Sequence, residues 1–293
     1  MHIKKTTADY IFDVFNYLFL SFLCVAALYP FIFVVFASFS DPNLMLRHNG
    51  FLLAPLGFSL DAYKAVMQNP NIGIGYKNTL IVLIGGTCLN MVVTSLAAYA
   101  LSRKSLEFRG VYLKLIVFTM VFSGGLIPLY LIVRGVGLTE SLWALIIPTL
   151  INTQNFIIMR TSFEAIPESL EESARIDGAN DFTILIRIVL PLSTATLAVI
   201  GLYYGVYHWN AWFHASMFLR DRSMYPLQLI LREILIQNDT SMMTTGAAAS
   251  DFVPLGETIK YATIVVATVP ILCVYPFLQK YFIKGVMIGA VKG

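Results

Sequence analysis

The sequence predicts an all-α integral membrane protein with six transmembrane helices. Of its 293 residues, 57% are hydrophobic and only 13% are charged, and the mean hydropathy is +0.73. Soluble domains carry about 25% charged residues, so this chain has too little polar surface for a water-exposed fold. Six apolar stretches also approach the roughly 20 residues that a helix needs to cross the bilayer core.

Six transmembrane spans can be marked along the chain. We place them at residues 17–39, 78–101, 111–133, 141–159, 188–208 and 261–282. Lys4 and Lys5 precede the first, as in a signal peptide, but this stretch exceeds the roughly 7–15 apolar residues of a signal core, so we expect it to be retained. Most spans contain a proline, which membrane helices tolerate where neighbouring helices satisfy the freed carbonyls. These prolines are Pro30, Pro128, Pro148, Pro191, Pro270 and Pro276.

The placement of basic residues predicts the orientation. Six spans put both termini on one side of the membrane, together with the loops after the second and fourth spans. That side holds Lys4, Lys5, Arg103, Lys104, Arg109, Lys114, Arg160, Arg175, Arg187, Lys280, Lys284 and Lys292, and the remaining 8 of the 20 Lys and Arg residues fall on the other side. Because cytoplasmic loops carry the excess of positive charge, we expect both termini to be cytoplasmic.

The opposite side then carries two long loops, 40–77 and 209–260, which are candidates for contact with an extracytoplasmic partner. In the second loop we expect an amphipathic helix at 227–236 and a loosely structured segment at 242–250.

Several classes of function lack their sequence signals. Cys24, Cys88 and Cys273 lie in apolar stretches without metal-ligand spacing, so we expect packed thiols and no metal site. His2, His48, His208 and His214 are isolated from one another, and no group of side chains suggests covalent chemistry. No GxxxxGK[ST] sequence occurs, so the chain should not hydrolyse nucleotide itself. The scattered basic residues argue against nucleic acid as a partner. We therefore expect neither an enzyme nor a bound cofactor.

A polar, acidic insert lies between the fourth and fifth spans, at residues 160–187. Pro167 suits the start of a helix, and the acidic residues after it favour the positive end of the helix dipole. Gly178 follows the end of this helix, where a left-handed residue is easiest for glycine. Asn180 and Asp181 are suited to cap a second helix, which we expect to be continuous with the fifth span. The small residues Ser173, Ala174 and Ala179 suggest a knob for another protein's groove, although a solvated connector has the same pattern.

The insert resembles the "EAA" signature of ABC importer permeases. Glu172-Ser173-Ala174, three residues, Gly178, nine residues, Ile188, one residue and Leu190-Pro191 match EAA-x3-G-x9-I-x-LP, with Ser173 in place of the first alanine. Asp177-Gly178-Ala179 is similar to the carbohydrate-uptake branch. The tail sequences Tyr281-Phe-Ile-Lys-Gly285 and Gly289-Ala-Val-Lys-Gly293 are also similar to it. The resemblance covers about Tyr76 to Gly293 and is closest to the smaller permease of maltose-type importers.

The resemblance implies a type I importer fold and a set of partners. These are a homologous permease, two ATPase subunits and an extracytoplasmic solute-binding protein, all assembled in the bacterial cytoplasmic membrane with its lipid. It implies a cytoplasmic segment at 1–16, an ABC transmembrane domain at 76–282 with its coupling loop at 160–187, and a cytoplasmic tail at 283–293. The insert would dock on an ATPase, so that ATPase closure moves the attached spans. The residues implied in this coupling are Glu172, Ser173, Ala174, Asp177, Gly178, Ala179, Leu190 and Pro191.

Polar and aromatic residues in the spans suggest where the substrate passes. Asn90, Asn152, Gln154 and Asn155 are polar groups at membrane depth, which either line a wet cavity or bond helices together. Tyr203, Tyr204, Tyr207, Trp209 and Trp212 gather at the outer end of the fifth span, where they form an interfacial belt or stack on sugar rings. The candidate substrate path comprises Asn152, Gln154, Asn155, Tyr204, Trp209 and Trp212.

The sequence thus predicts the permease of an ATP-driven oligosaccharide importer. Ser123-Gly-Gly125, Ser169–Gly178 and Tyr225–Leu229 resemble a subfamily that includes permeases for uronate oligosaccharides, such as the second permease of alginate importers. For such a substrate, Arg134 and Arg232 are candidate carboxylate ligands. A neutral oligosaccharide is the alternative cargo. An ion-coupled secondary transporter or a membrane-embedded enzyme would instead need charged or catalytic groups within the spans, which are nearly absent.

Overall fold

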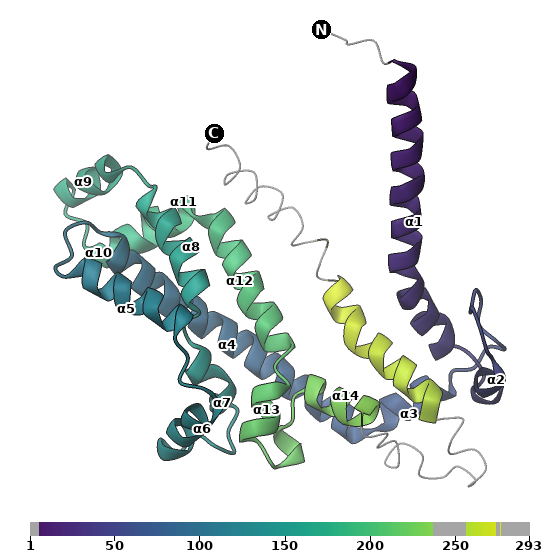
Figure 1. The fold of residues 1–293 in the computed structure, drawn as a ribbon. Helices are drawn as coiled ribbons and strands as arrows, with labels where there is room; N and C mark the ends of the chain where they lie inside the picture. Colours follow the sequence, from purple (N-terminus) through teal and green to yellow (C-terminus); the bar gives the residue numbers. More distant parts are fainter. Residues whose placement is uncertain (1–5, 237–255, 274–275, 277–293) are drawn as a thin grey trace. The chain divides into compact units, whose positions relative to one another are not determined.

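The computed structural model describes residues 6–236, 256–273 and 276, and these form helices and loops without a β-strand (Figure 1). The chain divides into two compact units. The first comprises residues 1–69 and 233–269, and the second comprises residues 70–232 and 270–293. The expected loose segment at 242–250 and the tail sequences at 281–293 lie outside the described residues.

The first unit contains a long apolar helix, α1 (Thr7–Ser38). A capping box starts it, because the Thr6 hydroxyl accepts from the Asp9 amide and the Asp9 carboxylate accepts from the Thr6 amide at 2.7 Å. The helix therefore begins ten residues before the predicted start of the first span. Nearly all its apolar side chains are exposed, as expected for a helix that meets lipid or partner helices. Two short helices follow, α2 (Pro42–Arg47) and α3 (Asp61–Gln68).

The second unit is built around α4 (Pro70–Ser102), which packs against α8 (Thr153–Glu164) and α12 (Thr194–Trp209) (Figure 1). The main core of this unit includes the buried side chains of Ala98, Phe156, Met159, Phe163, Ile184 and Ile200. The remaining elements of the chain up to residue 236 are α5 (Arg109–Val121), α6 (Leu126–Gly135), α7 (Trp143–Ile146), η1 (Ile147–Thr149), α9 (Glu168–Ile176), α10 (Asp181–Ile184), η2 (Leu185–Val189), α11 (Leu190–Leu192), α13 (Phe213–Phe218), η3 (Arg222–Met224) and α14 (Leu227–Ile236). The last of these confirms the helix expected at 227–236.

The described helices agree with a protein that crosses the membrane several times, but some of the predicted spans are bent or interrupted. Three helices are long and apolar enough to cross a membrane: α1, α4 and Gly256–Cys273. Two further pairs pass the same test only as bent spans. The chain bends by 117° between α5 and α6, and Gly125 at this break has φ +87°, a left-handed conformation that favours glycine. The stretch predicted as a span at 111–133 therefore contains a sharp bend.

The fourth and fifth predicted spans are also interrupted. The fourth is divided into α7, the 3-10 turn η1 and α8, and residues 150–152 lie between these helices. In the fifth, the chain bends by 87° between the stretch Asp181–Leu192 and α12. The expectation of one helix continuous from the insert into the fifth span was wrong, because the backbone leaves the helical conformation at Ser193 (φ −101°, ψ 16°), two residues after Pro191.

Candidate functional site

The acidic insert folds as a short helix, a tight turn and a second helix. Glu168 and Glu171 lie in the first turn of α9, where the dipole favours carboxylates. At its end the Gly178 amide donates to the Arg175 carbonyl at 3.0 Å, and the Ala179 amide donates to the Ala174 carbonyl at 2.9 Å. These two bonds make a Schellman turn, and Gly178 supplies the required positive φ of +83°. The local prediction of a glycine stop after this helix is confirmed.

The next helix starts at the predicted cap. The Asn180 side chain accepts from the Thr183 amide at 2.8 Å. Asp181, in the first turn of α10, pairs with Arg175 at 2.5 Å across the turn. Together the Schellman turn, the cap and this ion pair fix the angle between α9 and α10.

Two ion pairs join α9 to the segment that follows α4. Glu171 is buried and pairs with Arg103, whose side chain is only 16% exposed and lies over the Tyr99 ring at 4.7 Å. On the exposed side, Glu168 pairs with Lys104 at 2.7 Å, and this bond lowers the pKa of Glu168. These contacts make the insert part of the folded unit and not a free connector. Sequence reasoning missed them, because the partners are more than 60 residues apart.

A third carboxylate links α5 and α8 beside the insert. Glu164 accepts from Arg109 at 2.5 Å and from Arg160 at 2.6 Å. Both arginines also donate to the Leu101 carbonyl at the end of α4. The hydrogen bond from Arg109 holds the pKa of Glu164 below its usual range, so this carboxyl stays ionised at neutral pH. The ends of α4, α5, α8 and α9 therefore meet in one network of charges.

The residues expected to contact an ATPase divide between an inward and an outward face. Glu172, Asp177 and Gly178 are exposed, and Glu172 forms no ion pair within the described residues. Ile176 at the tip of α9 is 87% exposed, an unusual position for a large apolar side chain on a polar insert. In contrast, Ala174 and Ala179 are half-buried and pack in part on the core of this subunit. Ser173 is exposed, and its hydroxyl donates to the Ser169 carbonyl at 2.9 Å.

Leu190 and Pro191 lie at the elbow between the insert and the fifth span. They follow a π-helical turn, η2, and precede the 87° bend at Ser193. The π turn is a rare element that often occurs at functional sites. Its position just before Pro191 fits the need to move a carbonyl away from the proline ring.

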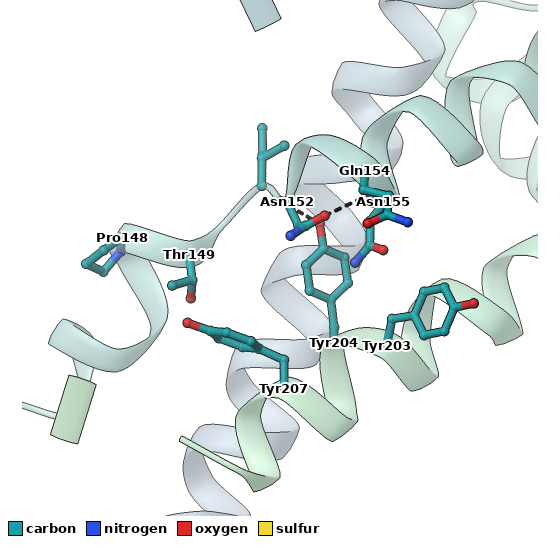
Figure 2. A pocket seen from close by; sticks show the side chains of 9 residues that line it. Pro148, Thr149, Asn152, Gln154, Asn155, Tyr203, Tyr204 and Tyr207 are labelled. Carbon is teal, nitrogen blue, oxygen red and sulfur yellow. Dashed lines mark hydrogen bonds between the residues drawn. The ribbon is translucent and has the colours of Figure 1, made fainter. Parts of the chain in front are cut away.

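A cavity of about 450 Å³ lies between the broken fourth span and α12 (Figure 2). Its nine lining residues are Pro148, Thr149, Ile151, Asn152, Gln154, Asn155, Tyr203, Tyr204 and Tyr207. Asn152, Gln154, Asn155 and Tyr204 were predicted for the substrate path, whereas Tyr203 and Tyr207 were noted only among the aromatic residues of the fifth span. None of the nine is charged. Within the described residues, no group of His, Cys, Asp and Glu is placed to hold a metal ion.

Two residues of the predicted path lie outside this cavity. Trp209 is buried and makes an edge contact with Tyr76. The Trp212 ring is covered by the Arg232 guanidinium at 4.1 Å. Neither Arg232 nor Arg134, the two candidate carboxylate ligands, lines the cavity.

Hydrogen bonds from α4 and α12 satisfy the interrupted backbone beside the cavity. Asn90 donates to the carbonyls of Thr149 and Leu150 at 2.6 and 2.8 Å, and its own oxygen accepts from His208 Nε2 at 2.7 Å. The Asn152 amide donates to the Tyr204 hydroxyl at 3.0 Å. Since unpaired backbone groups are very unfavourable at membrane depth, these side chains make the break possible. Asn90 therefore bonds helices together and does not line the cavity.

Replacing Asn90 by leucine is expected to destabilise this region. The change removes three hydrogen bonds, and hydrogen bonds between membrane helices average about 0.6 kcal/mol each, so the loss should reach about 2 kcal/mol. Thermal unfolding of the purified protein in detergent measures it. Asn210→Leu, which removes one exposed bond to the Val206 carbonyl, is the control and should change stability by less than about 0.5 kcal/mol. Equal effects of the two substitutions would contradict the assignment.

Comparisons with known proteins give one consistent set of relatives. The chain is 45% identical over 291 residues to the polygalacturonan/rhamnogalacturonan transport system permease protein YtcP of Bacillus subtilis. The alignment covers 97% of this chain and 99% of that protein. It is 41% identical over 289 residues to protein LplC of the same bacterium, in an alignment that covers 99% of this chain and 97% of LplC. It also matches a chain in the crystal structure of a bacterial ABC transporter involved in the import of the acidic polysaccharide alginate. That match has a TM-score of 0.91 and 33% identity over 96% of this chain and 100% of the other. No family model matches the chain.

Proposed function

Because the chain belongs to the family of sugar ABC transporter permeases, we propose that it imports an acidic oligosaccharide by alternating access driven by a separate ATPase. Membership in this family identifies a transport subunit of the membrane. The proposal adds the cargo, the coupling residues and the composition of the assembly. We propose that a homologous permease, two ATPase subunits and an extracytoplasmic solute-binding protein complete it, with both termini of this chain in the cytoplasm.

The observation that carries the coupling mechanism is the anchored insert with one free face. Two ion pairs join α9 to the segment after α4, and the Schellman turn fixes the angle between α9 and α10. Outside this framework, Glu172 and the exposed side chain of Ile176 are free to meet another protein. An apolar tip beside a free carboxylate suits a groove that has a basic rim. Force applied to α9 would then reach α4, α5 and α8 through the network of charges.

Two comparisons support an acidic cargo. One relative is named for polygalacturonan and rhamnogalacturonan transport, and the solved structure is an importer of the acidic polysaccharide alginate. The alternative, a neutral oligosaccharide, is favoured by one observation, the absence of charge among the nine lining residues of the cavity.

Reconstitution of the complete assembly in liposomes tests this function, with galacturonic acid trisaccharide as the probe. The wild-type assembly should import the trisaccharide only when ATP is supplied, and uptake should stimulate ATP hydrolysis. Uptake that persisted without ATPase subunits and collapsed with an ion gradient would establish secondary transport instead. Import of neutral trisaccharides alone would overturn the acidic cargo.

Glu172→Lys tests the coupling face within this assay. We expect trisaccharide-stimulated ATP hydrolysis to fall at least about tenfold, because a charge-assisted pair is replaced by repulsion between two cations. The fold should be unaffected, since Glu172 is exposed and makes no ion pair within the described residues. Gln68→Lys, which introduces the same charge at another exposed position, is the control. Unchanged coupling in the Glu172 variant would remove this residue from the docking face.

A further inference from the structure

The start of α8 points to a binding site for an anion in the cavity. Helix N-termini carry backbone N–H groups without intrahelical acceptors and a partial positive charge. In α8 the Asn152 side chain satisfies the Asn155 amide at 3.1 Å. The amides of Thr153 and Gln154 have no acceptor among the described residues. The cavity therefore meets this helix at its electropositive end.

Asn155 supplies a second and independent sign of a ligand. The residue is only 7% exposed, yet it lines the cavity. Figure 2 shows its amide projecting from α8 toward the tyrosines of α12. This amide makes no hydrogen bond with any described residue, and its polar atoms are not among the fully buried ones, so they remain accessible from the cavity. A ligand group in the cavity would complete its bonding.

We propose that the start of α8 and the Asn155 amide bind the carboxylate of one sugar residue during transport, while the neighbouring tyrosines contact its ring. The inference rests on the proposed import of an acidic oligosaccharide, and it explains how a cavity without a cation selects an anion. Neutral donors fixed in a region of low dielectric bind an anion more strongly than they would in water. They also release it more readily than an arginine would, which suits a site that the cargo must leave. The two arginines suggested by the sequence are not needed for this step.

Equilibrium binding to the membrane complex tests the proposal directly. The complex of both permeases and the ATPases is purified without the solute-binding protein, so that the discrimination measured belongs to the path. The probes are galacturonic acid trisaccharide and its fully methyl-esterified form, which has the same rings without the charge. The wild-type complex should bind the acid at least about tenfold more tightly, as expected when hydrogen bonds to a charged group are lost.

Two substitutions at Asn155 complete the test. Asn155→Asp should weaken binding of the acid about tenfold or more, because two carboxylates then oppose one another, and should leave the ester within about twofold. Asn155→Ala, which is safer for folding, should weaken the acid about threefold, as expected for one neutral bond of about 0.7 kcal/mol. Gln68→Glu, which introduces a carboxylate at an exposed position away from the cavity, is the matched control. Both variants must still assemble with the ATPases, as judged by gel filtration.

Each outcome has one meaning. Equal affinities of the wild-type complex for acid and ester, or equal weakening of both by Asn155→Asp, would overturn the carboxylate site. If neither probe bound to the complex, the carboxylate site would also be overturned. The proposed function would still stand if the complete assembly imported the acid. Failure of the complete assembly to import the acid would refute the proposed function separately.

Discussion

Gly178→Asp should reduce sugar-stimulated ATP hydrolysis and uptake at least about a hundredfold, because a side chain and a negative charge would enter the docking face, a loss of about 2.7 kcal/mol. Gly178 has φ +83°, and its conformation closes the Schellman turn after α9. Within this subunit a side chain would meet nothing within 4 Å. Any steric loss must therefore come from a partner that approaches the turn closely. The measurement is trisaccharide-stimulated ATP hydrolysis in the reconstituted assembly.

Two further substitutions separate the causes of this effect. Gly178→Asn has nearly the same size and the same tolerance of a positive φ as Gly178→Asp but carries no charge, so it separates the steric effect of the side chain from the effect of its charge. Gly110→Asp introduces the same charge at an exposed position with open space and no positive φ, and it should keep nearly full activity. If Gly178→Asp were as active as Gly110→Asp, the turn would not be part of the coupling surface.

Glu171→Ala should lower the free energy of unfolding by about 3 kcal/mol, because it leaves the Arg103 guanidinium nearly buried without its carboxylate. Detachment of α9 from the segment after α4 should also uncouple ATP hydrolysis from uptake. Thermal or denaturant unfolding in detergent measures the first effect, and the reconstituted assay measures the second.

The adjacent residue provides a matched control. Glu172→Ala removes the same group one position away, on the exposed face, and should change stability by less than about 0.5 kcal/mol. The double substitution Arg103→Met with Glu171→Leu should recover most of the stability, since apolar residues often replace a buried ion pair without loss. A double variant as unstable as Glu171→Ala would argue against the ion pair as the source of the effect.

The parts of the insert that follow local rules were predictable from sequence. A helix that stops before Gly178 and a cap at Asn180 depend on residues only a few positions apart, and both are present. The pairing of Glu171 with Arg103 was not predictable, because nothing in the sequence brings positions 68 residues apart together. For the same reason Ala174 and Ala179 could not be recognised as partly turned toward the subunit's own core.

The apolar stretches of the spans were predictable, but the shape of the backbone within them was not. Hydropathy averaged over about 20 residues detects an apolar stretch but does not detect where the backbone breaks. The described residues contain three long apolar helices and two bent pairs, and the interrupted fourth span remains a prediction as a membrane crossing. The role of the cavity tyrosines was ambiguous because it depends on how α12 packs beside α8. The start of α8 is capped locally by Asn152, but it is also held by tertiary hydrogen bonds from Tyr204 and Asn90, which sequence does not reveal.

The π-helical turn before Pro191 means that the number of residues between the insert and the fifth span determines the direction in which the insert's surface faces. A π turn contains one residue more than an α turn, and one residue corresponds to a rotation of about 100° around a helix axis. Deletion of a single residue between Leu185 and Val189 would therefore swing Ile176 and Glu172 to a different side of the fifth span. A change of one residue in this turn is therefore expected to turn the proposed docking surface away from the ATPase.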